Sequence, residues 1–223
     1  NTNDNYWKKF TDRLPRLCEQ FMVEITASCE SIGQRAEYIR SGLNWNKFER
    51  HVNELAESNY PDMEMGFQAS LNALSISGMP NFIRWCKELN EKYARFIMIN
   101  PSMVTDPSMF NPIILDPSYS KYIEESISML LEADPYEAQD YPTGRWTTYA
   151  EFLTSIRDNI ASNMGADNNN WGLGGNRLGS REASMKQLYN FCTTIDNRRK
   201  IQFEETFPEM LEFWNECKEV SNR

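Results

Sequence analysis

Oxygen donors and charged groups are concentrated in a short run that directly follows a strand-like segment. Val23, Ile25 and Ala27 alternate with polar residues, which is the pattern of a β-strand with one buried face. The apolar pattern then stops, and a run of small or polar residues follows: Ser28, Cys29, Glu30, Ser31 and Gly33. In parallel α/β folds, ligands bind outside the carboxyl ends of the strands. This run is therefore the first candidate for a ligand-binding site, although the same residue types also suit an ordinary connection between a strand and a helix.

Metal-dependent and triad-based hydrolysis lack their usual residues in this chain. His51 is the only histidine, and its helical position predicts a surface or half-buried role, so a zinc hydrolase or a Ser-His-Asp triad is not indicated. The cysteines are scattered, and no CxxC pair occurs among Cys18, Cys29, Cys86, Cys192 and Cys217. This distribution predicts reduced thiols, most of them buried as small hydrophobic residues.

Composition indicates a globular protein with a substantial core. The chain has 223 residues, of which 40% are hydrophobic, enough for one large or two small domains. A net charge of -9 and a pI near 4.8 argue against broad binding of nucleic acid. Because neither a membrane-spanning run nor a signal peptide is readable, we expect a cytoplasmic protein that does not bind a membrane. The first residue is Asn1 rather than Met, which leaves open that the chain is a fragment.

The elements that must position the polar run alternate between helices and strands. Strands are expected at 22–27, 63–71 and 95–100, with helices at 6–20, at 45–57 and from about Pro80. Such alternation implies right-handed parallel crossovers, and hence an α/β sheet or a section of a barrel. Beyond Pro117 no strand is predicted, and helices are expected near 118–132, 146–163, 181–197 and 207–219.

A second possible ligand site is the Asn- and Gly-rich loop GADNNNWGLGGN at 165–176. It lacks the GKS/T ending of a P-loop and follows a predicted helix rather than a strand. Nucleotide binding at Gly174 and Gly175 is therefore only a third hypothesis, although the helix start at Ser180 could accept an anion.

Several segments carry a resemblance to a known family. The stretch SIGQRAEYIRSGLNW, preceded by a strand and by SCE, resembles the SxDGxGERxEYIRxGxxW segment of radical S-adenosylmethionine proteins of the twitch-domain type. FQASLNALSISGMPNFIRW is similar to the next strand, loop and helix of that family, and DNRRKIQFEETFPEMLEFW to its usual ending. The match spans nearly the whole chain and is specific mainly in two segments.

The resemblance implies a fold, a pair of cofactors and an activity. The fold would be a partial parallel (β/α) barrel of about three strands in residues 1–116, with a mostly helical C-terminal extension in 117–223. The complete protein would hold a [4Fe-4S] cluster on a Cys-x3-Cys-x2-Cys motif, which is absent here and expected upstream, so this chain alone is expected to hold no cofactor and to be inactive. With S-adenosylmethionine, the cluster would generate a 5'-deoxyadenosyl radical for hydrogen abstraction from a substrate, which could be a peptide or protein.

The resemblance also assigns cofactor-binding residues. Ser28 and Glu30 match the Ser and Asp that face the ribose and methionine part of S-adenosylmethionine, although Glu30 is one methylene longer and Ser31 replaces a Gly. Arg40 matches an Arg expected to meet the cofactor carboxylate; its alternative role is an ion pair with Glu37 or Glu30. Further positions at strand ends are Thr2, Asn3, Gln68, Ser70 and Asn100.

A hypothesis from a different class is a non-catalytic α/β interaction module that lacks the cluster. If the partial-barrel interpretation holds, the strand at 22–27 would normally pair with an earlier barrel strand. The isolated chain would then expose an open edge, through which we expect it to self-associate unless the first helix folds over that edge.

Overall fold

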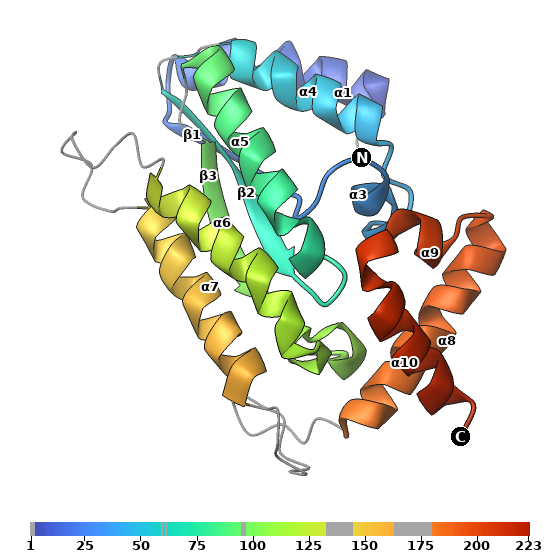
Figure 1. The fold of residues 1–223 in the computed structure, drawn as a ribbon. Coiled ribbons are helices and arrows are strands. Elements are labelled where there is room, and N and C mark those ends of the chain that lie inside the picture. The colour runs from blue at the N-terminus through green and yellow to red at the C-terminus, as the bar shows by residue number, and fades with distance from the viewer. Residues whose placement is uncertain (1–2, 59, 61, 95–96, 133–144, 163–179) are drawn as a thin grey trace.

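A three-stranded parallel sheet forms the centre of the fold (Figure 1). The computed structural model describes residues 3–58, 60, 62–94, 97–132, 145–162 and 180–223. The strands are β1 (Val23–Ser28), β2 (Met63–Leu71) and β3 (Ile97–Met103), in the spatial order β1-β2-β3. Both neighbouring pairs are parallel. The predicted α/β class is confirmed, and its strands follow the order of the chain.

Helices cover one face of this sheet. They are α4 (Trp45–Glu57), α5 (Met79–Tyr93), α6 (Ser120–Glu132) and α7 (Arg145–Ser162) (Figure 1). Phe67 of β2 points into this layer, where its ring centroid lies 5.7 Å from that of Phe82 and 5.2 Å from that of Trp85. Within the described residues, no helix has the length and apolar character needed to cross a lipid bilayer.

Local signals explain where α4 begins. The Asn44 side chain accepts a hydrogen bond from the Lys47 N–H, which satisfies one of the free donors at the helix start. The Glu37 carboxylate accepts a second one, from the Trp45 N–H at 2.6 Å. The residue that was an alternative ion-pair partner for Arg40 therefore caps a helix.

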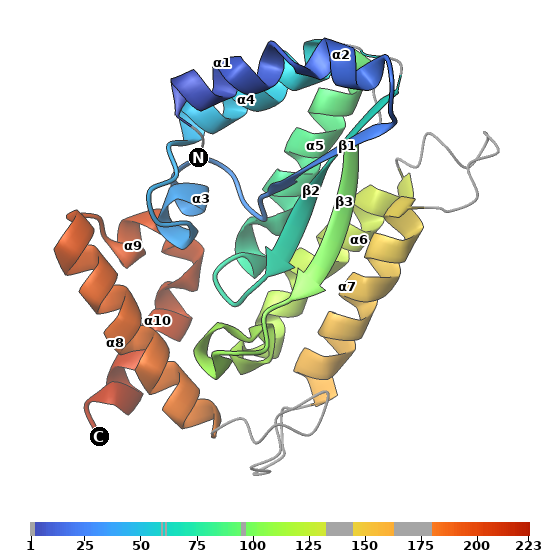
Figure 2. The ribbon, with the colours of Figure 1, turned by 180° about the vertical axis from the view of Figure 1, so that it is seen from behind.

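The amino-terminal segment differs from the single helix expected at 6–20. It forms α1 (Asp4–Thr11) and α2 (Leu14–Cys18), because the chain breaks at 12–13 and Pro15 suits the first turn of a new helix. α1 lies along α4, where the Trp7 ring stacks on the His51 ring at 3.9 Å (Figure 2). His51 is buried by this contact, so the predicted surface or half-buried position is wrong.

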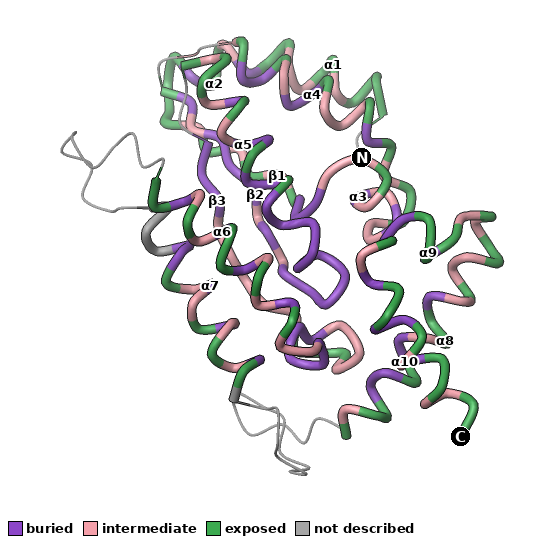
Figure 3. The backbone as a smooth tube through the Cα atoms, viewed as in Figure 1, coloured by how far each residue is buried: buried purple, intermediate pink, exposed green. Residues whose placement is uncertain are grey.

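Three short 3-10 helices follow β3 in the proline-rich segment. They are η2 (Ser108–Phe110), η3 (Pro112–Ile114) and η4 (Pro117–Tyr119). An earlier one, η1 (Ile76–Gly78), lies between β2 and α5. The segment 71–80, which contains η1, is buried throughout (Figure 3). These turns follow β2 and β3 in the chain, beyond the carboxyl ends of the strands. Ligands of parallel sheets bind at this end of the sheet.

The C-terminal part packs beside the carboxyl ends of the strands (Figures 1 and 2). It consists of α8 (Arg181–Arg199), α9 (Phe203–Thr206), η5 (Pro208–Met210) and α10 (Leu211–Ser221). Phe203 stacks on Trp214 at 4.2 Å, and both are buried, so these aromatic residues serve packing. Helix α8 contacts η2, where the Ser108 and Ser184 hydroxyls lie 2.9 Å apart.

Candidate functional site

The second face of the sheet is not covered by any helix of the described residues (Figure 2), and most of its side chains are polar, with the buried Met98 as an apolar exception. Successive side chains of a strand point to opposite faces, so the even-numbered residues share this face. Glu24, Thr26 and Ser28 of β1 are exposed, and Gln68 and Ser70 of β2 are half-buried. Asn100 and Ser102 of β3 are half-buried as well. Hydroxyl and amide groups therefore form a surface that can donate and accept hydrogen bonds.

The strand register arranges these groups in rows. Ser28, Gln68 and Asn100 form one row across the sheet, because Ser28 pairs with Gln68 and Gln68 with Asn100. Ser70 and Ser102 form the next row toward the carboxyl ends. The Gln68 amide donates to the Ser102 hydroxyl at 3.2 Å, which in turn donates to the Ser70 hydroxyl at 3.1 Å. The rows are thus linked into one network that a polar ligand could join.

A buried ion pair lies where β1 ends. Glu30 is only 3% exposed, and its Oε2 accepts hydrogen bonds from Nε of Arg40, at 3.0 Å, and from Nη2 of the same guanidinium. Burial raises the pKa of the Glu30 carboxyl above its ordinary value, and the Arg40 charge opposes that rise only in part. Glu30 Oε1 and Arg40 Nη1 make no hydrogen bond with any described residue. The pair therefore offers one acceptor and one donor to a ligand.

The loop that carries Glu30 packs closely against η1. The Ser31 hydroxyl is buried without a hydrogen-bond partner in the described part of the chain. A Cβ atom on Gly78 would lie 3.2 Å from that hydroxyl, so glycine allows η1 to approach the loop. The Cys29 thiol donates to the Ser31 carbonyl at 3.1 Å, and burial raises the pKa of this thiol to about 12. Cys29 is therefore a structural thiol rather than a nucleophile.

The C-terminal part holds the helix that follows this loop. This helix, α3 (Gly33–Ile39), was not predicted from the sequence. Arg35 makes two hydrogen bonds to Glu209, at 2.7 and 2.5 Å, and its guanidinium lies 5.2 Å from the Phe207 ring. The Tyr38 hydroxyl donates to Asp196 at 2.7 Å. Residues separated by more than 150 positions thus fix the helix between Glu30 and Arg40.

The cysteines do not form a site for an iron-sulfur cluster. All five lie in the described part of the chain, where they are buried and carry no disulfide bond. Among the described residues, no group of three or more Cys, His, Asp or Glu side chains is arranged to hold a metal ion. The donor set of this chain therefore does not fit a [4Fe-4S] cluster.

The predicted site residues divide into four groups. Ser28, Gln68, Ser70 and Asn100 share the uncovered face, and Glu30 and Arg40 pair at its end. Asn3 caps α1, where its side chain accepts from the Tyr6 N–H at 3.0 Å. Thr2 and the loop with Gly174 and Gly175 lie outside the described residues.

Sequence reasoning missed Ser102 and the contact of Arg35 with Glu209. Ser102 follows Asn100 with strand spacing, so it could have been found if the strand had been extended through Pro101. The partners Arg35 and Glu209 are 174 positions apart, and no local signal connects them.

Comparisons of this chain with protein-family models, with curated proteins and with solved structures give no match.

Proposed function

We propose that this chain supplies the last strands of a radical S-adenosylmethionine (β/α) barrel and that its uncovered sheet face binds S-adenosylmethionine. One observation carries the proposal: helices cover one face of a parallel sheet, and the other face bears rows of hydroxyl and amide groups. In a (β/α) barrel the helices lie outside and the second face lines the interior. A polar interior face at the carboxyl ends of the strands suits a cofactor with a ribose and an amino acid group.

Each group of residues has a role in this proposal. The row of Ser28, Gln68 and Asn100 binds the ribose hydroxyls through side-chain hydrogen bonds. Arg40 Nη1 donates to the carboxylate of the methionine part, and Glu30 Oε1 accepts from its amino group. The paired charges keep the two groups in fixed positions, which supports binding in one orientation.

The chemistry of the proposed enzyme comes from its cofactors, and this chain contributes positioning. Bound S-adenosylmethionine and a [4Fe-4S] cluster supply a 5'-deoxyadenosyl radical for hydrogen abstraction. Since the cysteines described above do not fit the cluster, the proposal assigns its ligands to residues that this chain does not supply. The contacts of α3 with α8 and η5 hold Glu30 and Arg40 in place. The proposed substrate is a peptide or protein.

The test is isothermal titration calorimetry of S-adenosylmethionine with the complete protein, in which this chain is joined to the cluster-binding part, because this chain alone is expected to hold no cofactor. We expect saturable binding that Gln68→Ala weakens about 3- to 10-fold, the effect of one lost hydrogen bond. Gln187→Ala, an exposed change on α8, is the matched control and leaves the affinity unchanged. Absence of binding, or equal affinities of the two variants, contradicts the proposal.

A specific observation favours the second candidate function, a non-catalytic interaction module. Phe21 and Met22, directly before β1, are 62% and 76% exposed, which is unusual for large apolar side chains side by side. They adjoin the edge of β1 that has no partner strand among the described residues. Association of this chain through the edge, together with absence of S-adenosylmethionine binding by the complete protein, would support the module.

A further inference from the structure

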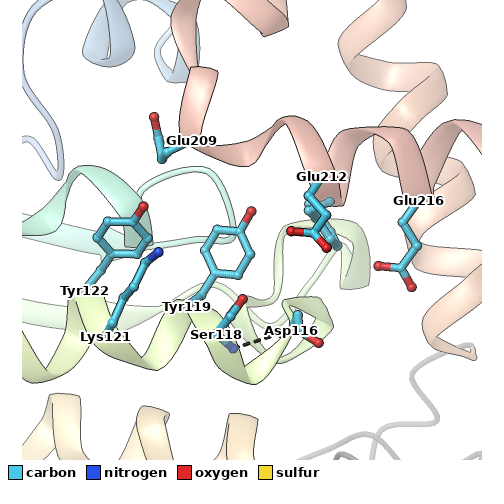
Figure 4. A pocket seen from close by; sticks show the side chains of 9 residues that line it. Asp116, Ser118, Tyr119, Lys121, Tyr122, Glu209, Glu212 and Glu216 are labelled. Atoms are coloured by element: carbon cyan, nitrogen blue, oxygen red, sulfur yellow. Dashed lines mark hydrogen bonds between the residues drawn. The ribbon is translucent and has the colours of Figure 1, made fainter.

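A pocket of about 270 Å³ lies between the segment that leads into α6 and the final helix α10 (Figure 4). At about 30 Å³ per water molecule, this volume accommodates a ligand the size of a long side chain. Three aromatic rings line it, from Tyr119, Tyr122 and Phe213. Four carboxylates line it as well: Asp116, Glu209, Glu212 and Glu216.

The carboxylates are only partly compensated. Arg35 pairs with Glu209, and Arg181 makes two hydrogen bonds to Glu216, at 2.6 and 3.1 Å. Glu212 has neither an ion pair nor a hydrogen bond with any residue in the described ranges. Among the described residues, Asp116 accepts a hydrogen bond only from the backbone N–H of Ser118, at 2.9 Å. The pocket therefore keeps negative charge that a cation could neutralise.

A mostly buried side chain whose hydroxyl has no partner in the described ranges points to a ligand independently of this charge. Tyr119 is 5% exposed, and its hydroxyl makes no hydrogen bond within the described part of the chain. Figure 4 shows this hydroxyl directed away from η4, toward the helix that carries Glu212. Burial and then the neighbouring Tyr122, Glu209 and Glu212 raise the pKa of the Tyr119 phenol, so it stays neutral. A neutral phenol can accept a hydrogen bond from an ammonium group.

The aromatic rings form a surface that already contacts a cation. The Tyr119 ring lies 6.0 Å from that of Tyr122 and 6.2 Å from that of Phe213. The ammonium group of Lys121 lies 4.9 Å from the centroid of the Tyr122 ring, which is the distance of a cation–π contact. The chain itself therefore contains one cation–π contact between an ammonium group and these rings.

We propose that this pocket binds a protonated organic amine, with its ammonium group between the Tyr119 hydroxyl and the Glu212 carboxylate. The amine belongs either to a free diamine or to a lysine side chain of a peptide. A metal ion fits less well, because aromatic walls provide no ligands and the carboxylates do not converge in the described residues. The proposal is independent of S-adenosylmethionine binding, since the pocket uses none of the residues of the sheet face.

The experiment is calorimetric titration of the purified chain with 1,5-diaminopentane and, separately, with Nα-acetyl-lysine N-methylamide. We expect saturable binding of at least one amine below about 20 mM, the range of a weak single site. Tyr119→Phe weakens it about 3- to 10-fold through loss of one hydrogen bond. Glu212→Gln weakens it about 2- to 5-fold through loss of one exposed charge. Whichever probe binds more tightly identifies the source of the amine.

Matched controls separate the pocket from general attraction to an acidic protein. Glu219→Gln removes the same charge as Glu212→Gln from an exposed position of α10 outside the pocket, and leaves binding unchanged. Lys121→Gln strengthens binding about 2- to 5-fold by freeing the Tyr122 ring, whereas Lys218→Gln does not. Circular dichroism confirms that each variant folds. Absence of saturation with both amines, or equal affinities of Tyr119→Phe and Glu219→Gln, overturns the proposal.

Discussion

The free-energy cost of burying the Glu30 carboxylate depends on its one partner, Arg40. The carboxylate is almost fully buried, whereas the Arg40 side chain keeps 29% exposure and can reach water. Removal of a charge from water costs more than pairing regains in most buried pairs, so the pair itself adds little stability. Loss of the cation alone is different, because it leaves an uncompensated carboxylate inside the protein.

We therefore predict an asymmetric, pH-dependent effect for this pair. Arg40→Met lowers the free energy of unfolding by about 3 kcal/mol at pH 7. Burial already raises the folded-state pKa of Glu30 above its unfolded value, and loss of Arg40 raises it further. A raised acid pKa gives stability at low pH that is lost as the pH rises through the folded value, so the deficit is smaller near about pH 5. Urea unfolding at both pH values measures it.

The double variant Glu30→Gln/Arg40→Met is the control for this prediction. It removes both charges, so it should recover most of the stability and lose the additional pH dependence. A deficit of Arg40→Met that is the same at both pH values would show that the carboxylate is not the cause.

At the scale of the elements, local patterns located the segments whose own residues determine their structure. The alternation in 63–71 and the cap at Asn44 gave β2 and the start of α4 with the bounds that the structure has. The helix α3 was missed because its stability comes from residues of α8 and η5 rather than from its own sequence. Gln68 and Ser70 of the candidate site were predictable because they belong to a strand that its own pattern indicates. The proposed amine pocket was not predictable, because it joins segments that are far apart in the sequence and share no pattern.

The contact of α3 with η5 leads to a second prediction. Burial raises the pKa of Glu209, but hydrogen bonds from Arg35 and Ser77 outweigh it, so the folded-state pKa lies below the ordinary value. A lowered acid pKa gives stability above the unfolded pKa that is lost as the pH falls through the folded value. Glu209→Gln should therefore lower the free energy of unfolding by about 2 kcal/mol at pH 7, and by less near about pH 3.

Urea unfolding of Glu209→Gln and of Glu205→Gln, an exposed change on the neighbouring α9, measures this difference. Equal stability of the two variants at pH 7 would mean that the ion pair of Glu209 with Arg35 contributes nothing to the attachment of α3.

At the scale of the molecule, the edge of β1 is the least protected part of the sheet. Val23, Ile25 and Ala27 face the helices yet stay half-buried, and α1 lies along α4 instead of along this edge. The Val23 N–H donates to the carbonyl of Asp62, directly before β2, and the Cys29 N–H donates to that of Gln68 in β2. The alternation of a parallel ladder therefore directs the Thr26 N–H away from β2. Open edges of this kind pair with further strands.

We predict that the chain self-associates through this edge and that Thr26→Pro reduces the association. Proline removes the outward N–H and leaves the hydrogen bonds to β2 intact. Light scattering coupled to size-exclusion chromatography over a concentration series measures the mass, with Thr26→Ala as the control that keeps the N–H. A wild-type chain that remains monomeric at all concentrations contradicts the prediction, as does equal association of the two variants.

The contact between Arg35 and Glu209 also has a consequence for the order in which the protein matures during translation. A ribosome that adds about 5–20 residues per second needs on the order of 10–30 s to synthesise the 174 positions that separate the two residues. During that time the strands can already pair, because β1, β2 and β3 leave the ribosome first. The segment from Glu30 to Arg40 obtains its tail contacts only when the last helices emerge. The uncovered face can therefore form before the loop beside it has its contacts with α8 and η5, so the candidate site is complete only after residues 196–209 have been synthesised.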